Sequence, residues 1–402
     1  CRVRQNGGAG AAAVTRSGAE SFARHLPTAA QRGIICCIIA GEGRGRSGAR
    51  AEGNTLKLKK FTGLLLCAAL ALSMAACKFT TPAVVMTVEG EDIPAGLYLM
   101  YQYQAYSSAK SKLEDKSAKV LKSEIEGLKA EEWIHNETVA SAKRYVWVEK
   151  AFAEAGLTFT EEEQASIDSQ LDTIWANNEA LLAANGIGRE NYRRFYECEA
   201  KYEKLLAEYQ DGESDKITDA EAKKYMDETY SRIQTLVLPT TDADSAALPD
   251  EKLEELNALA AQLADDLNAG GSMDELGPET LEKAFEICGR EYAEDTASSY
   301  MSKSFLTAES TSYSEEFVQG VVAAEVGAAG VYDGYSVPMI YQKIANYEDN
   351  DDFTANYKTT ILSEITSAAF SDKVEEETAA YAVTEDASAV KTYSPSKIRE
   401  SV

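Results

Sequence analysis

The periodicity of the chain changes at residues 230–238, which read Tyr230-Ser231-Arg232-Ile233-Gln234-Thr235-Leu236-Val237-Leu238. Before this stretch the apolar residues recur at helical spacing, whereas Ile233 to Leu238 is a short, mostly apolar run that Pro239 closes. Such a run is typical of a β-strand. A strand that follows a long series of helices predicts an α+β protein, with a mostly helical first part and a small mixed part after it.

The residues upstream of this strand predict a helical block over 84–212. Val84 to Ile93 alternates apolar and polar residues around Glu89-Gly90, which indicates a short strand and a turn. We expect helices from Pro94, over 130–155, from Thr160, over 189–209 and from Thr218. Thr160 with Glu163, and Thr218 with Glu221, have the spacing of capping boxes, which mark the starts of two of these helices.

The residues downstream of the strand predict a small α+β block. We expect helices over 253–267 and 317–326 and a last strand over Met339–Ile344. Apolar residues at helical spacing then predict a helix over 353–370. The residues after Ala380 are polar, so we expect 381–402 to be a flexible tail.

Residues 1–54 differ in composition from the rest of the chain. They contain eight Arg, three Glu and neither Lys nor Asp, whereas Lys, Glu and Asp dominate the later sequence. We interpret them as an upstream extension that precedes the true translation start, with Leu56 as the candidate because a TTG codon can initiate. The alternative is a disordered basic arm. Intact-protein mass spectrometry distinguishes the two.

Residues 55–76 have the features of an export signal. Lys57, Lys59 and Lys60 precede an apolar stretch over 61–76, which is shorter than the roughly 20 residues that a membrane span needs. The stretch ends in Met74-Ala75-Ala76-Cys77, which resembles the lipobox of bacterial lipoproteins. That resemblance implies cleavage before Cys77, a diacylglycerol on its sulfur and a tether over 77–83. The alternative is an ordinary signal peptide with a chance cysteine.

The composition excludes several functions. The formal net charge of -26 argues against nucleic acid as a partner, since phosphates would be repelled. His25 and His135 are the only histidines, which removes most histidine chemistry. Only Cys198 and Cys288 follow Cys77, too few for a disulfide framework, and we interpret Cys288 as a buried structural cysteine. No metal or phosphate motif is visible, so we expect no metal and no cofactor.

Several stretches, in this order, resemble the parvulin-class foldases of the PrsA and SurA type that act outside the cytoplasm. They are Met86–Pro94, Asn185–Ile187 with Arg193–Phe195 and Thr218–Glu221, Tyr230–Leu238, Ala324–Gly327 and Met339–Ile344. The resemblance covers residues 84–375. It implies a helical, SurA-N-like chaperone domain over 84–212, completed by 353–373, with an inserted parvulin-like domain over 213–350. It also implies unfolded exported polypeptides as partners, and homodimers through the helical domain, as is common in the family.

The resemblance also points to a site, with departures from the family pattern. Parvulins usually carry a histidine on the first strand and another on the last, beneath the bound prolyl peptide. Thr235 and Met339 stand at those positions here. Met301, Tyr313 and Phe317 align with the family's apolar pocket, which implies peptide binding, although the same residues would also suit a plain core.

This resemblance implies two possible functions, and a third, of a different class, remains as an alternative. The first is a foldase or chaperone, lipid-anchored on the extracytoplasmic face of the bacterial cell membrane, with weak or lost peptidyl-prolyl isomerase activity. The second is an active isomerase with a rearranged site. The third is a non-catalytic binding lipoprotein of the cell envelope.

Overall fold

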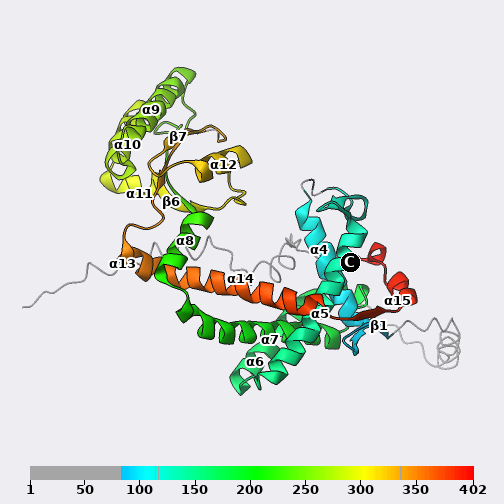
Figure 1. The fold of residues 1–402 in the computed structure, drawn as a ribbon. Coiled ribbons are helices and arrows are strands. Elements are labelled where there is room, and N and C mark those ends of the chain that lie inside the picture. Colours follow the sequence, from blue (N-terminus) through cyan, green and yellow to red (C-terminus); the bar gives the residue numbers. More distant parts are fainter. Residues whose placement is uncertain (1–82, 114, 116, 336) are drawn as a thin grey trace, which may run out of the picture. The chain divides into compact units, whose positions relative to one another are not determined.

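The computed structural model describes residues 83–402 apart from 114, 116 and 336. These residues form two compact units, which we call the helical unit (83–209 and 369–402) and the sheet unit (210–368). The chain passes from one unit to the other within helix α7 (Arg189–Glu213) and again within helix α14 (Lys358–Ala379) (Figure 1). The extension, the export signal and Cys77 lie outside the described residues, so the structure says nothing about them.

The helical unit begins with the predicted strand and turn. Strands β1 (Val84–Val88) and β2 (Glu91–Pro94) pair antiparallel, with Val88 opposite Glu91. Glu89 and Gly90 between them both have positive φ, of 52° and 83°, as a tight hairpin turn requires. Pro94, whose missing N–H is not needed at a helix start, then leads into helix α4 (Ala95–Lys112). The β1–β2 hairpin and α4 therefore follow from local sequence alone.

Three long helices complete the first part of this unit: α5 (Ala130–Glu154), α6 (Glu161–Ala184) and α7. Short elements that the sequence did not predict, η1 (Val120–Lys122), β3 (Glu124–Ile125) and β4 (Leu128–Lys129), connect α4 to α5. The predicted capping box starts α6, because Thr160 N–H donates to Glu163 at 2.7 Å and Glu163 N–H donates back to the Thr160 hydroxyl. The core between α4, α6 and α7 contains buried Leu97, Tyr101, Leu171, Tyr192 and Phe195.

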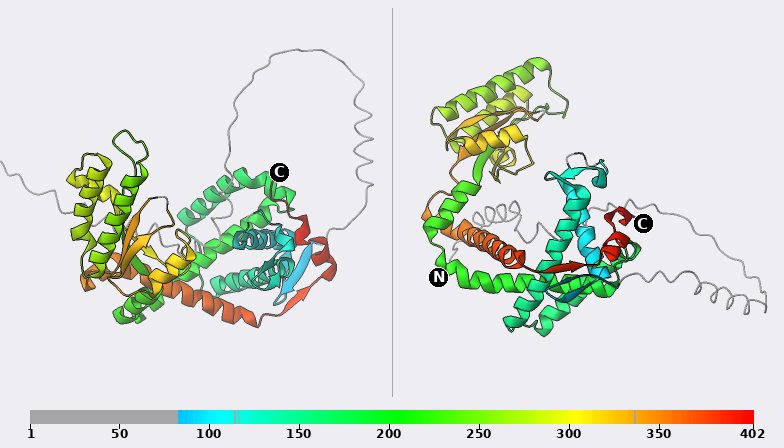
Figure 2. Two further views of the ribbon diagram at one scale, coloured as in Figure 1. Left: turned by 90° about the horizontal axis from the view of Figure 1, so that it is seen from above. Right: turned by 45° about the vertical axis from the view of Figure 1, so that its right-hand side comes forward.

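The C-terminal residues differ from the flexible tail expected over 381–402. They form β9 (Val383–Glu385), α15 (Ala387–Thr392) and η5 (Pro395–Lys397). Strand β9 pairs antiparallel with β1, placing Val383 opposite Val88, and Ala389 is fully buried beside this sheet. Figure 2 shows these red C-terminal elements against the blue and cyan start of the unit. A few well-spaced apolar residues and one strand pairing hold this polar segment, and neither signal is visible in its composition.

The sheet unit is built on an antiparallel sheet of order β6-β5-β8-β7. Its elements in chain order are η2 (Ser214–Lys216), α8 (Asp219–Thr229), β5 (Ser231–Val237), α9 (Asp250–Asn268), α10 (Met273–Cys288), η3 (Glu294–Thr296), α11 (Ala297–Tyr300), β6 (Met301–Leu306), α12 (Glu315–Ala323), β7 (Ala329–Tyr332), β8 (Met339–Ile344) and α13 (Asn350–Asp352). The strand expected at 233–238 is thus β5, one of the two inner strands of the sheet, which spans Ser231–Val237. The strand expected at 339–344 has the predicted bounds.

Helices cover both faces of this sheet. Successive side chains of a strand point to opposite sides, so each strand supplies residues to both faces. Leu236 on β5 and Ile340 on β8 pack against α9 and α10. Ile233 on β5 points the other way and packs with Val321 of α12. Figure 1 shows α9 and α10 on one side of the sheet and α12 on the other. The sheet therefore has two different faces, one covered by α9 and α10 and the other by α12.

The returning segment is divided between the units, which differs from the boundaries expected near 350 and 353–373. Its first part, a π-helical turn over Phe353–Tyr357 and the start of α14, packs on α8 within the sheet unit. There Phe353 and Ile361 contact a buried cluster with Met226. The later part of α14 belongs to the helical unit, where Phe370 packs between α5 and α7. The spacing of apolar residues predicts a helix here, but it does not show which element each turn of that helix packs against.

Candidate functional site

Thr235 and Met339 lie on the same face of neighbouring strands. Residue pairing places Val237 of β5 opposite Met339 of β8, and Thr235 opposite Tyr341 two residues along. Both side chains are buried, and the Thr235 hydroxyl lies 2.9 Å from the Ser302 hydroxyl on β6. The structure therefore brings the two positions together, with a pair of hydroxyls and a thioether where the family pattern has imidazoles.

Five aromatic rings gather on this same side of the sheet, and we call them the aromatic face. They are Tyr313, Phe317, Tyr332, Tyr335 and Tyr341. Phe317 is central, since its ring centroid lies 4.6 Å from that of Tyr332, 4.9 Å from Tyr341 and 5.0 Å from Tyr313. Tyr335 packs on Tyr332 at 5.0 Å and is 45% exposed, so the cluster reaches the surface of the protein.

Local sequence explains how Phe317 is positioned. Ser314 is the N-cap of α12, and its hydroxyl accepts the Phe317 N–H. The Ser314 N–H donates in turn to the Tyr332 hydroxyl at 3.2 Å, which ties the start of α12 to β7. On β7, a Cβ added at Gly330 would approach the Tyr341 ring to 3.0 Å, so a glycine lets that ring lie close to the strand.

Lys343 holds the other end of α12 against the sheet. Its Nζ donates to the carbonyl oxygens of Val321 and Val322 at 3.0 Å and of Ala324 at 2.8 Å. These carbonyls lie at the end of the helix, where a positive charge is favourable, and that of Val321 also accepts the Ala324 N–H at 3.3 Å. Burial lowers the pKa of the Lys343 ammonium. With its donors engaged, Lys343 acts as a positioning residue for α12 and Phe317.

Met301 is not brought together with the other predicted residues. It is the first residue of β6, pairs with Leu236 and therefore points to the face covered by α9 and α10. A Cβ added at Gly277 of α10 would lie 2.9 Å from the Met301 Cε. Met301 thus packs directly against α10 in the core, while Tyr313 and Phe317 lie on the opposite face.

The aromatic face offers apolar and aromatic surface with hydroxyl donors. Its five residues, with Thr235, Ser302 and Met339, include no His, Cys, Asp or Glu. Burial, with the nearby Tyr335 and Tyr332, raises the pKa of the Tyr313 hydroxyl, which therefore stays protonated near neutral pH. The arrangement can bind apolar and aromatic groups and donate hydrogen bonds, but it holds no group that exchanges protons near pH 7.

Sequence reasoning missed three members of this face. They are Tyr332, Tyr335 and Tyr341, which lie within ten residues of one another and are visible as a cluster in the sequence. What the sequence did not show is the pairing of β7 with β8. This pairing places Tyr332 opposite Met339 and directs Tyr332 and Tyr341 to the side of α12.

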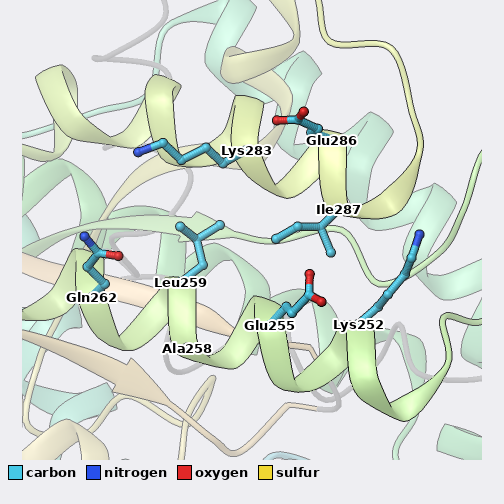
Figure 3. Close-up of a pocket in the computed structure, with 8 residues that line it drawn as sticks. All are labelled: Lys252, Glu255, Ala258, Leu259, Gln262, Lys283, Glu286 and Ile287. Carbon is cyan, nitrogen blue, oxygen red and sulfur yellow. The ribbon is translucent and has the colours of Figure 1, made fainter.

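A second surface feature lies on the far side of the same sheet, between α9 and α10. It is a shallow groove of about 660 Å³ lined by Lys252, Glu255, Ala258, Leu259, Gln262, Lys283, Glu286 and Ile287. Figure 3 shows Leu259 and Ile287 facing one another along its floor, with the charged residues around the rim. The groove contains no predicted site residue, and its charges of both signs select no obvious ligand.

Other chemistry finds little support in the part of the chain that the structure describes. No group of three or more His, Cys, Asp and Glu residues there is arranged to hold a metal ion. Cys198 and Cys288 are both buried and unpaired, and the Cys288 thiol, whose pKa burial raises, lies 3.4 Å from the Pro239 carbonyl oxygen. Of the described helices, none is both long and apolar enough to cross a membrane.

Comparison with known proteins gives matches of structure only. No family model matches the sequence, and no curated protein matches it. The structure resembles those of PrsA foldases and SurA-like chaperones. It shares 16% identity with the foldase PrsA of Streptococcus pneumoniae, covering 78% of this chain and 99% of that one, with a TM-score of 0.28. It also shares 16% identity with PrsA of Bacillus subtilis, covering 62% of this chain and 87% of that one, with a TM-score of 0.25.

A SurA-like chaperone structure from Campylobacter jejuni gives a similar result. It is 11% identical, covers 76% of this chain and 100% of that one, and has a TM-score of 0.24. At such identities and TM-scores these likenesses carry no argument about function. The argument for function therefore rests on this chain's own residues.

Proposed function

We propose that this protein is a lipid-anchored foldase outside the cytoplasm, which binds unfolded exported polypeptides and has little or no peptidyl-prolyl isomerase activity. The observation that carries the proposal is the aromatic face beside Thr235 and Met339, where binding surface is present and imidazoles are absent. The order of foldase-like sequence motifs and the lipobox at Cys77 support the same proposal.

The aromatic face suits the recognition of extended, apolar segments. Flat rings that are already packed on one another lose little conformational freedom when a ligand covers them. Rotation about a prolyl bond meets a barrier of roughly 18–20 kcal/mol, and an enzyme lowers it only by binding the twisted bond better than the planar one. Thr235 and Met339 provide no charged or imidazole group for that purpose. Binding without isomerisation is the expected result.

The main alternative is an active isomerase with a rearranged site. The observation that favours it is the pair of hydroxyls on Thr235 and Ser302, 2.9 Å apart, which could serve as donors to a twisted peptide. The two functions differ in a measurable rate, because only an isomerase accelerates the interconversion of a Xaa-Pro peptide.

The purified mature protein is expected to suppress aggregation of an unfolded client while leaving prolyl isomerisation near its uncatalysed rate. Light scattering of a denatured client measures the first property, and a protease-coupled assay on a Xaa-Pro peptide measures the second. A robust isomerase rate, lost in Thr235→Val, would establish the alternative. No suppression of aggregation at excess protein would reject the chaperone proposal.

Anchoring by Cys77 has a separate test. In the bacterial host, the wild-type protein should fractionate with membranes and incorporate labelled fatty acid. Cys77→Ser should abolish the label, because the serine side chain has no sulfur to carry the lipid. Lys78→Gln, the adjacent position in the tether, is the matched control and should stay membrane-bound. Labelling that persists in Cys77→Ser would contradict the proposal.

A further inference from the structure

Residues 395–400, near the C-terminus, pack on the surface of the helical unit. We call residues 395–400 the C-terminal latch, and we use the name latch groove for the surface that the latch covers: Tyr106 and Lys110 of α4, Asn185 at the end of α6, and the buried apolar cluster against which Ile398 packs. That cluster consists of Ala105, Ala109, Leu113, Val120, Ile125, Ala130, Trp133 and Ile134. The turn after α6 lies against α4, because a Cβ added at Gly186 would meet Leu99 at 3.0 Å. Two elements distant in sequence are thus in contact, and the latch reaches residues of both.

The Asn185 side chain forms hydrogen bonds with the main chain of the latch. Its side-chain amide donates to the carbonyl oxygen of Arg399 at 3.0 Å, and its carbonyl oxygen accepts the Arg399 N–H at 2.8 Å. Both main-chain groups of one residue are therefore satisfied, as they would be beside a neighbouring β-strand. Contacts of this kind hold an extended backbone whatever its side chains.

Side chains on either side of Arg399 add selectivity. Ile398, in extended conformation, packs against the apolar cluster. Two residues on, the Glu400 carboxylate accepts a hydrogen bond from the Tyr106 hydroxyl at 2.6 Å and pairs with the Lys110 ammonium. These contacts lower the pKa of Glu400, first through Lys110 and then through Tyr106, so the carboxylate is ionised at neutral pH. The groove therefore recognises an extended segment of pattern apolar, any residue, acidic.

The latch is held less firmly than the C-terminal elements before it. Lys110 and Glu400 keep 44% and 46% of their side-chain surface exposed, and exposed ion pairs contribute little and are screened by salt. By contrast, β9 is paired along β1 and Ala389 is fully buried. Pro395 is itself buried, so the part that can open locally is 396–400, while Pro395, α15 and β9 remain in place.

We infer that the latch groove is a binding site for extended segments of unfolded clients, and that the protein's own residues 395–400 occupy it as a displaceable substitute. The inference rests on the proposed chaperone function and names one surface and one ligand class for it. A client segment with an apolar residue two positions before an acidic one competes with the latch for Asn185, Tyr106 and Lys110.

The test uses the full mature chain and a fluorescent peptide with the sequence of residues 394–402. The variant Ile398→Ser with Glu400→Gln weakens the latch but leaves the groove intact. This unlatched variant should bind the peptide at least about tenfold more tightly than the wild type. The reason is that its own C-terminal residues no longer fill the latch groove, so most molecules are free to bind the peptide. Adding Asn185→Ala, which removes both hydrogen bonds to the main chain of Arg399, should remove most of that gain. Lys391→Gln on exposed α15 is the matched control and should behave as the wild type.

Fluorescence anisotropy measures binding, and aggregation of a denatured client measures the consequence. Stronger suppression of aggregation by the unlatched variant supports the inference, and equal binding of the peptide by wild type and unlatched variant overturns it. Tighter peptide binding with unchanged suppression of client aggregation also overturns it, because the latch groove would then only hold the protein's own C-terminal residues. If even the wild type fails to suppress aggregation, the proposed function fails, whereas the peptide data still decide whether the groove binds in trans.

Discussion

Replacing Phe353 with Ala is expected to destabilise the sheet unit by about 3–5 kcal/mol, the cost typical of deleting a fully buried phenylalanine ring. Phe353 has no exposed surface, and it packs against Ala222, Met226 and Tyr230 in the cluster that joins the returning segment to α8. Its ring also lies 5.3 Å from that of Tyr347. The loss should fall on the sheet unit, because all of these partners belong to it.

The two units can be followed separately in the full chain. Trp133, Trp147 and Trp175 are the only tryptophans, and all lie in the helical unit, so fluorescence reports its unfolding alone. Hydrogen exchange of β5 and β8 reports the sheet unit. In Phe353→Ala, exchange of these strands should increase while the tryptophan transition stays where it is.

Phe370→Ala in α14 is the reciprocal control. Phe370 is also buried, but its ring lies 5.7 Å from Trp147 and 5.2 Å from Tyr202, both in the helical unit. This variant should shift the tryptophan transition and spare β5 and β8. If either variant destabilised both units equally, the units would unfold as one and the division at residue 368 would be rejected.

The parts of the fold that the sequence predicted well are those that local chemistry determines. Both capping boxes are present, at Thr160 with Glu163 and at Thr218 with Glu221, because each needs only residues three positions apart. Strand β8 has the expected bounds, since apolar residues and the preceding Pro338 delimit it. The α+β class follows from the same local changes of period.

The parts that the sequence missed depend on distant partners. Strand β9 exists because β1, nearly 300 residues earlier, offers an edge to Val383 and Thr384. In the site, the side of a sheet that a residue faces depends on register, and a shift of one residue reverses it. Met301 and Ser302 illustrate this, since only Ser302 shares the face of Thr235. An alignment to a family pattern does not show which face of the sheet a residue points to unless the strand pairing is known.

Replacing Phe317 with Leu is expected to weaken binding of an apolar client peptide at least about tenfold. Phe317 packs on Tyr313, Tyr332 and Tyr341, and it is the ring through which Tyr341 joins the other tyrosines. Tyr313, Tyr332 and Tyr335 contact one another directly, so the loss of Phe317 should separate Tyr341 from them and remove the central ring of the surface. Leu keeps most of the side-chain volume, so the cost in stability should stay below about 1.5 kcal/mol. Isothermal titration with the peptide and thermal unfolding of the same samples separate the two effects.

Val331→Ser provides the matched control, because it removes a similar exposed apolar group from the opposite side of the same sheet. Val331 is 39% exposed and pairs with Ile340, whose side chain belongs to the α9 and α10 side. If binding depends on the aromatic face, Val331→Ser should bind as the wild type does. An equal loss in both variants would mean that general surface hydrophobicity holds the peptide. Unchanged binding in Phe317→Leu would exclude the aromatic face as the peptide site and leave the latch groove as the surface to test for clients.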